Sequence, residues 1–132
     1  MTEGSYSKHD RENIRIILKH CEEIEYFIRL YGSDEEEFEG NPSLQCGCVV
    51  HLMQIGEHVK RLSPEIRNDR EEIDWKDAAG LRDIIAHQYE DLNYSWIRKT
   101  VLNRIPVLKD VCQSILDDDK TSVSTNGPSD SD

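Results

Sequence analysis

The first long patterned segment reads KHDRENIRIILKHCEEIEYFIRLY from Lys8 to Tyr31, and it predicts an amphipathic helix. Its apolar residues recur at spacings of three and four, which places them on one stripe of an α-helix. They are Ile14, Ile17, Leu18, Cys21, Ile24, Phe27, Ile28 and Tyr31. Ser7 and Asp10 are both suitable N-caps, and Gly32 suits the position after the last helical residue.

Helical spacing continues through most of the chain that follows. Pro42 suits the first turn of a second helix, and Pro106 either kinks a later helix or begins a new one. The expected helical segments are Ser43–Leu62, a single turn over Pro64–Arg70, Trp75–Tyr89 with Asp74 as its N-cap, Tyr94–Arg104, and Val107–Leu116. No convincing strand alternation interrupts them. The sequence therefore predicts an all-α fold, an antiparallel bundle of four to five helices.

The charge of the chain is uneven. The 132 residues carry a formal net charge of −11, which at first argues against a polyanionic partner. Residues 33–39 hold five acids and no base, and residues 117–132 hold five acids against one base. The remainder is close to neutral, so a local site for an anionic substrate stays open. We expect a bundle over residues 1–116 and a disordered acidic tail over 117–132. The acidic stretch Ser33–Gly40 is either a loop or the solvated start of the next helix.

Composition also limits the compartment and the cofactors. No apolar run reaches the ~20 residues of a membrane span, and the polar N-terminus does not resemble a secretory signal. We therefore expect a cytoplasmic protein with no membrane partner. Cys21 and Cys112 fall on apolar helical faces, where they pack as small hydrophobes. Cys46-Gly-Cys48 with His51 nearby lacks the usual zinc spacing, so neither a metal site nor a cofactor is expected.

The segment after Gly80 gathers chemistry on one helical face. With ~100° per residue, Leu81, Ile84, Ile85 and Gln88 form the core-facing arc. The opposite arc holds Arg82, Asp83, Ala86, His87, Tyr89 and Glu90. A solvated face of ordinary charges would look similar. However, a guanidinium can grip a phosphate, and an imidazole can exchange a proton near neutrality. Together they are the minimum needed to cleave RNA without a metal.

The same segment, Arg82-Asp-Ile-Ile-Ala-His87-Gln-Tyr89, resembles the R-x4-H-x-Y motif of HepT-like ribonucleases in the HEPN superfamily. Flanking stretches over about residues 8–116 are also similar, including Gln54–Leu62. The resemblance implies a HEPN-like homodimer in which two motif helices form a composite RNA cleft. It implies that Arg82 and His87 are catalytic, and that Asp83 supports one of them. It further implies a minimal nucleotidyltransferase antitoxin that transfers AMP to Tyr89. His58 departs from the family's usual small residue there, and could line or border the cleft.

The leading hypothesis is therefore a metal-independent endoribonuclease toxin of a type VII toxin–antitoxin system, with RNA and not DNA as its substrate. Lys60, Arg61 and Arg98 are candidate RNA-binding residues, although each taken alone is more typical of an ordinary surface charge. The alternative is a non-catalytic helical partner of a nucleotidyltransferase or a nucleotide. A structural bundle with an accidental motif is the third interpretation.

Overall fold

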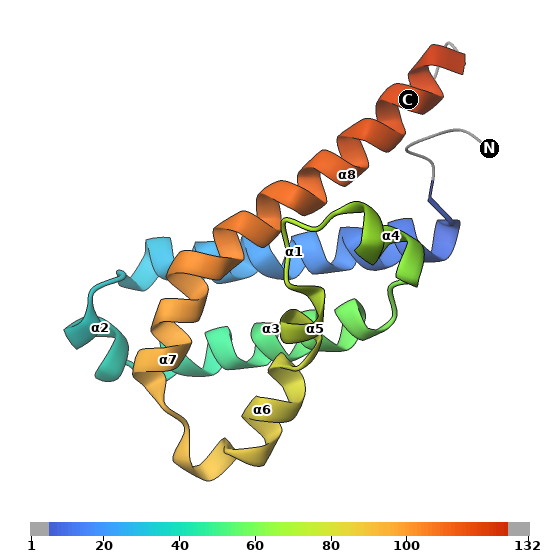
Figure 1. The fold of residues 1–132 in the computed structure, drawn as a ribbon. Helices are drawn as coiled ribbons and strands as arrows, with labels where there is room; N and C mark the ends of the chain where they lie inside the picture. Colours follow the sequence, from blue (N-terminus) through green and yellow to red (C-terminus); the bar gives the residue numbers. More distant parts are fainter. Residues whose placement is uncertain (1–5, 127–132) are drawn as a thin grey trace.

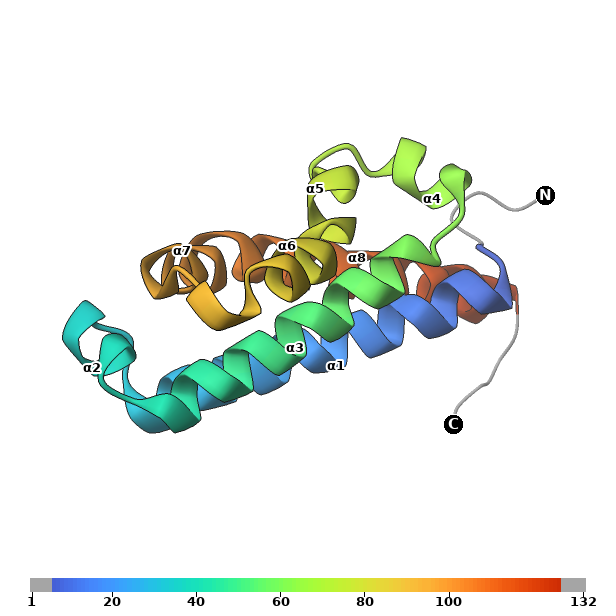
Figure 2. The same ribbon diagram turned by 90° about the horizontal axis from the view of Figure 1, so that it is seen from below.

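The fold is all-α, and no strand occurs over residues 6–126, which are the residues that the computed structural model describes. Three long helices share one core. Figures 1 and 2 show most of the shorter helices on one side of them, and one short helix at the end where the first two long helices are joined. In chain order the helices are α1 (Lys8–Tyr31), α2 (Glu35–Glu39), α3 (Pro42–Lys60), α4 (Pro64–Asp69), α5 (Trp75–Ala79), α6 (Leu81–His87), α7 (Tyr94–Lys99) and α8 (Ile105–Asn126). A 3-10 turn, Tyr89–Asp91, follows α6, and a π-helical segment, Thr100–Arg104, joins α7 to α8. None of the helices in the described part is long and apolar enough to cross a membrane.

Helices α1 and α3 run antiparallel side by side, as expected for an antiparallel bundle (Figure 2). Ser7 is the N-cap of α1, and its Oγ accepts from the backbone N–H of Asp10 at 3.0 Å. Gly32 ends the helix with φ of +101°, a conformation that favours glycine. Asn41 caps α3 and Pro42 occupies its first turn. Local capping signals therefore set both helix boundaries.

The core is built from the apolar stripes of α1, α3 and α8. Their fully buried side chains include Ile14, Ile17, Cys21, Ile24, Leu44, Cys48, Leu52, Ile55, Val59, Cys112 and Ile115. The acidic segment contributes as well, because α2 buries Phe38 completely while its carboxylates remain exposed. The acidic stretch Ser33–Gly40 therefore contains a short helix, Glu35–Glu39, that is anchored by one aromatic residue.

The structure differs from the sequence prediction after Asp74. One helix was expected over Trp75–Tyr89, but the chain forms α5 and α6 with a break at Gly80 and then a 3-10 turn. Asp74 does cap α5, accepting from the backbone N–H of Asp77. The Gly80 N–H is shared between the carbonyls of Lys76 and Asp77, which tightens the end of α5. The chain therefore changes direction before the motif begins.

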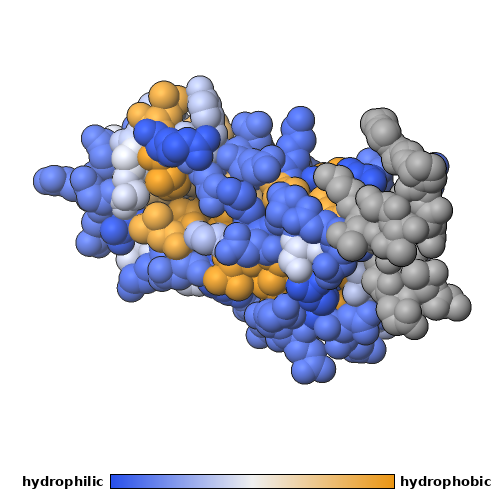
Figure 3. Space-filling model, turned by 90° about the horizontal axis from the view of Figure 1, so that it is seen from above, coloured by the Kyte–Doolittle hydropathy of each residue, from blue (hydrophilic) through white to orange (hydrophobic). Residues whose placement is uncertain are grey.

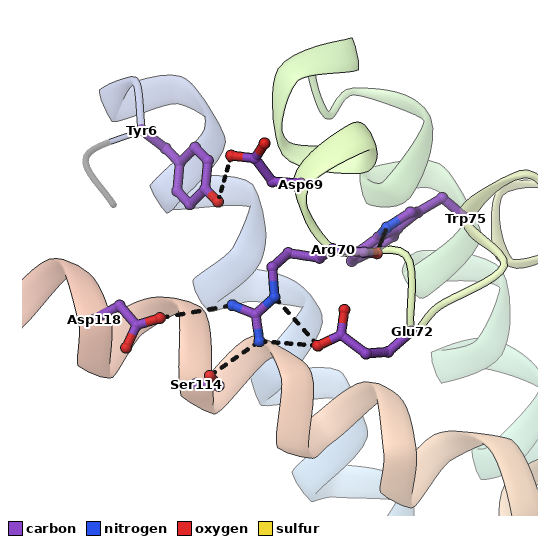
Figure 4. Close-up of polar contacts among 7 residues, drawn as sticks. All are labelled: Tyr6, Asp69, Arg70, Glu72, Trp75, Ser114 and Asp118. Atoms are coloured by element: carbon purple, nitrogen blue, oxygen red, sulfur yellow. Dashed lines mark hydrogen bonds and ion pairs between the residues drawn. The ribbon is translucent and has the colours of Figure 1, made fainter. Parts of the chain in front are cut away.

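The last helix is also longer than expected. Spacing predicted a helix end near Leu116, whereas α8 continues to Asn126. The Arg70 guanidinium donates to Ser114 Oγ at 3.0 Å and lies 3.7 Å from Asp118 Oδ2. Figure 4 shows how these side chains join α8 to the segment after α4. These contacts fix the turn of α8 where the acidic composition begins, and a helix already formed extends at little cost. Residues 127–132 of the expected tail lie outside the described residues.

The π-helical segment accommodates Pro106. Ile105 donates its backbone N–H to the Thr100 carbonyl, five residues back. Because proline has no N–H and its ring crowds the preceding turn, one widened turn lets the chain remain helical through it. Pro106 therefore lies in the first turn of α8, directly after the widened turn, and the backbone stays helical through it.

Candidate functional site

A close contact with α3 positions the motif helix α6. Gly56 lies so near the start of α6 that a Cβ built on it would stand 2.8 Å from the Arg82 backbone nitrogen. Leu81 and Ile85 anchor α6 in the core, being 3% and 0% exposed. Ile84 is 37% exposed and Gln88 is exposed, although both were expected in the core. The helix is only seven residues long and is held mainly by α3, so its outer side stays uncovered.

Arg82 stands in a charge-balanced cluster of four side chains. Its Nε lies 2.9 Å from Oε2 of Glu57 on α3, and its Nη1 lies 3.6 Å from Oδ1 of Asp83. Lys60 Nζ donates to the same Asp83 oxygen at 3.2 Å. We call Glu57, Lys60, Arg82 and Asp83 the arginine cluster. Two cations and two carboxylates cancel, so the cluster carries no net charge to attract an anion over a distance.

The other motif residues are exposed. His87 ends α6, and Tyr89, which is 65% exposed, begins the 3-10 turn. In the described part of the chain, Asp83 contacts Lys60 and Arg82 and forms no hydrogen bond with His87. Asp83 therefore contacts the arginine and not the histidine. The chain presents a guanidinium and an imidazole on an open surface, where they could contact a phosphate and exchange a proton.

The candidate RNA-binding residues separate into different parts of the molecule. Lys60 joins the arginine cluster through Asp83. Arg61 follows α3, where its Nη1 lies 3.4 Å from His58 Nδ1. Arg98 on α7 donates from Nε to the Ser33 carbonyl at 2.8 Å, which ties α7 to the loop before α2. Only Lys60 is thus brought into contact with the motif.

His58 belongs to a separate histidine cluster between α1 and α3. Its Nδ1 lies 2.8 Å from Oδ1 of the buried Asn13, and its ring stacks with that of His20. His20 Nδ1 and His51 Nδ1 are 2.8 Å apart. Burial lowers the pKa of all three imidazoles, and for His20 the neighbouring histidines lower it further. His58 faces α1, whereas its neighbour Glu57 reaches Arg82 on α6.

The four cysteines are free thiols. Burial raises the pKa of Cys48 and of Cys112 to about 12, and Cys21 is shifted in the same direction. These three are therefore protonated and unreactive at neutral pH. Within the described residues, no group of three or more His, Cys, Asp or Glu side chains is placed to hold a metal ion.

A cavity of about 180 Å³ lies between the loop before α5 and the π-helical segment. Leu81 and Thr100 are among its lining residues, but Arg82, His87 and Tyr89 are not. Elsewhere the surface is largely hydrophilic with local apolar patches, as the face in Figure 3 shows. The large hydrophobic side chains most exposed in the described part are Tyr26, Leu30, Val50, Ile84, Tyr89 and Val107.

Sequence reasoning missed Glu57 and Gly56. Both lie in the Gln54–Leu62 segment that resembles the family, but nothing in their local spacing links them to Arg82, 25 and 26 positions later. The available signal was a glycine inside a helix next to a carboxylate. A glycine there lowers helix propensity, and a close approach of two backbones is one reason to keep it.

Comparison with known proteins identifies the family. The profile of the family described as Ribonuclease HepT-like matches residues 17–115. The chain is 36% identical over 113 residues to the protein named Putative RNase TTE0752 from Caldanaerobacter subterraneus subsp. tengcongensis, covering 86% of this chain and 99% of that protein. It is 32% identical over 102 residues to Putative RNase MJ0125 from Methanocaldococcus jannaschii, covering 77% and 86%. No solved structure gave a significant match. The helical fold, the matched residues and these relatives together show that the chain belongs to the HepT-like ribonuclease family.

Proposed function

We propose that the chain is a metal-independent endoribonuclease toxin of a type VII toxin–antitoxin system, acting in the cytoplasm on RNA. The observation that carries the proposal is the position of Arg82 and His87. Both lie on one short helix whose outer side is open to a substrate. Family membership supports the ribonuclease activity, and the exposed guanidinium and imidazole supply its chemistry.

In the proposed reaction, the 2′-oxygen of a ribose attacks the adjacent phosphorus, and the bond from phosphorus to the 5′-oxygen breaks. His87 exchanges a proton with the attacking or the leaving oxygen. Arg82 stabilises the negative charge that develops on the phosphorane oxygens. The products are a 2′,3′-cyclic phosphate and a free 5′-hydroxyl.

We propose that two protomers form the cleft. On one protomer the motif lies on an open surface beside exposed apolar side chains, Ile84 and Tyr89. A second copy packed there would cover this apolar surface and bring two motifs together. A fully active monomer in light scattering would contradict this arrangement.

RNA cleavage in EDTA tests the function. The wild type should cleave tRNA or mRNA and leave cyclic phosphate ends, whereas Arg82→Ala and His87→Ala should lose the activity and the growth arrest. Arg15→Ala is the matched control, because Arg15 is an exposed arginine of α1 paired with Glu12. Cleavage by either motif variant at the wild-type rate would refute the mechanism. A wild type that binds RNA or a nucleotidyltransferase without cleavage would support the non-catalytic alternative.

We further propose that a minimal nucleotidyltransferase neutralises the toxin by AMPylation of Tyr89. The tyrosine is 65% exposed and follows the motif helix directly, so its hydroxyl is accessible to a partner enzyme. The AMP phosphate would add negative charge and bulk near Arg82 and oppose an incoming RNA phosphate. Mass spectrometry after co-expression should find AMP on Tyr89 and not on Tyr26, which is 51% exposed. Modification of Tyr26 in place of Tyr89 would overturn the assignment.

A further inference from the structure

Glu57 makes the shortest ion-pair contact of Arg82. The Glu57 carboxylate is 32% exposed on α3, and the Arg82 guanidinium is 45% exposed on α6. The 2.9 Å contact joins Oε2 to Nε and not to either terminal nitrogen. Gly56, the preceding residue, is the point where α3 comes closest to the backbone of Arg82. The backbone contact and the side-chain contact therefore come from adjacent residues of one helix.

We propose that Glu57 is a positioning residue for Arg82, an inference that rests on the proposed function. A carboxylate at Nε restrains rotation of the guanidinium about its last bonds. Arg82 Nη1 is 3.6 Å from Asp83, which is too long for a hydrogen bond. In the described part of the chain, neither terminal nitrogen of Arg82 forms a hydrogen bond. We infer that the edge formed by these two nitrogens keeps its donors for the phosphate, which guanidinium binds in a two-pronged geometry.

The same carboxylate opposes RNA electrostatically. It lies beside the group that meets the phosphate, so it repels the substrate before and after binding. Glu57 should therefore improve the chemical step through the orientation of Arg82 while weakening the binding of RNA. A residue that only stabilised the fold would not raise kcat while weakening the binding of RNA.

The test compares Glu57→Ala and Glu57→Gln with the wild type. For Glu57→Ala we expect kcat per folded enzyme to fall about tenfold or more, because a misplaced catalytic group is costly. Its Kd for fully 2′-O-methylated RNA, which cannot be cleaved, should stay equal or become tighter. Glu57→Gln keeps a polar side chain of the same length beside Nε, so it should recover most of the lost kcat. The matched control is Glu12→Ala, since Glu12 forms an ion pair of the same 2.9 Å length with Arg15 on α1.

Two further measurements separate the possible outcomes. Circular dichroism melts give the folded fraction of each variant, and the Hε resonance of Arg82 in NMR reports the Nε contact without any cleavage. In Glu57→Ala this resonance should shift and exchange faster with water. If Arg82→Ala is inactive but Glu57→Ala cleaves at the wild-type rate, the positioning role is wrong and the proposed function stands. If Arg82→Ala cleaves at the wild-type rate, the proposed function is wrong and the role of Glu57 falls with it.

Discussion

Replacing Gly56 with alanine tests whether the close approach of α3 and α6 sets the position of Arg82. The new Cβ would stand 2.8 Å from the Arg82 backbone nitrogen and 3.2 Å from its Cβ. Ordinary contact begins at 3.4 Å, so the start of α6 must move by about 0.6 Å. A backbone atom cannot rotate away as a flexible side chain can. The displacement therefore acts directly on the motif.

The matched control is Gly80→Ala, between α5 and α6. A Cβ there would lie 3.5 Å from the nearest backbone oxygen, and φ is −79°, which alanine adopts freely. Both substitutions remove the conformational-entropy cost of ordering a glycine, which is up to about 1 kcal/mol. Only Gly56→Ala adds an overpacking cost of about 1–3 kcal/mol. The difference between the two variants in free energy of unfolding should therefore be about 1–3 kcal/mol, with Gly56→Ala the less stable.

Urea unfolding monitored by circular dichroism measures the stability difference, and RNA cleavage measures its effect on the motif. Gly56→Ala should lose about tenfold or more in kcat per folded enzyme because Arg82 moves relative to Glu57. Gly80→Ala should cleave at close to the wild-type rate. If Gly56→Ala matches Gly80→Ala in both stability and cleavage, the contact between α3 and α6 does not position the arginine.

Three other predictions concern the fold. Asp10 is buried and accepts hydrogen bonds from Ser63 N at 2.9 Å and from Ser63 Oγ. Asp10→Ala should therefore lower the free energy of unfolding by about 2–3 kcal/mol. A loss of under about 0.5 kcal/mol in urea unfolding would refute this role. Arg70→Ala removes the contacts with Ser114, Glu72 and Asp118 (Figure 4). It should lower the free energy of unfolding by about 1–2 kcal/mol. The control is Arg15→Ala, which should change the free energy of unfolding little. The lowered pKa values of His20, His51 and His58 mean that the unfolded chain binds more protons below its ordinary histidine pKa of 6.5. The free energy of unfolding should therefore be constant above about pH 7 on this account and fall as the pH drops through 6.5. The melting temperature measured against pH tests this. If the melting temperature of a His20→Gln/His51→Gln variant falls as steeply with pH as that of the wild type, the prediction is wrong.

The parts of the fold that follow local rules were predictable from the sequence. The bounds of α1 and the start of α3 depend on caps and on proline, which act over one turn. The buried stripes follow from spacing alone, because each long helix has one face on the core. The break at Gly80 was not predicted, since a helical wheel assumes a continuous helix. The exposure of Ile84 was missed for a related reason: the wheel shows one apolar arc and not which neighbour covers it.

In the candidate site, too, the residues within one motif were predictable from the sequence, and their contacts with other helices were not. Arg82, His87 and Tyr89 were identifiable because they lie within eight residues of one motif. The partners of Arg82 were not, because contacts between α3 and α6 depend on how two helices pack. Local spacing favoured an interaction between Asp83 and His87, four residues apart. In the structure Asp83 instead contacts Lys60, 23 residues away, and Arg82 beside it.

The arginine cluster also changes how the charge of the chain bears on function. Most of the net charge of −11 lies in α2 and the C-terminal residues, so the sequence allowed a local cationic site elsewhere. Within the chain, however, Glu57 and Asp83 balance Arg82 and Lys60. Under the proposed function, long-range attraction would then contribute little to RNA binding. Recognition would depend on short-range geometry, in which the guanidinium meets a phosphate in the proposed cleft between two copies of the chain. On this reasoning, the carboxylates restrain the arginine at the cost of affinity for RNA, and catalysis depends on how precise that restraint is.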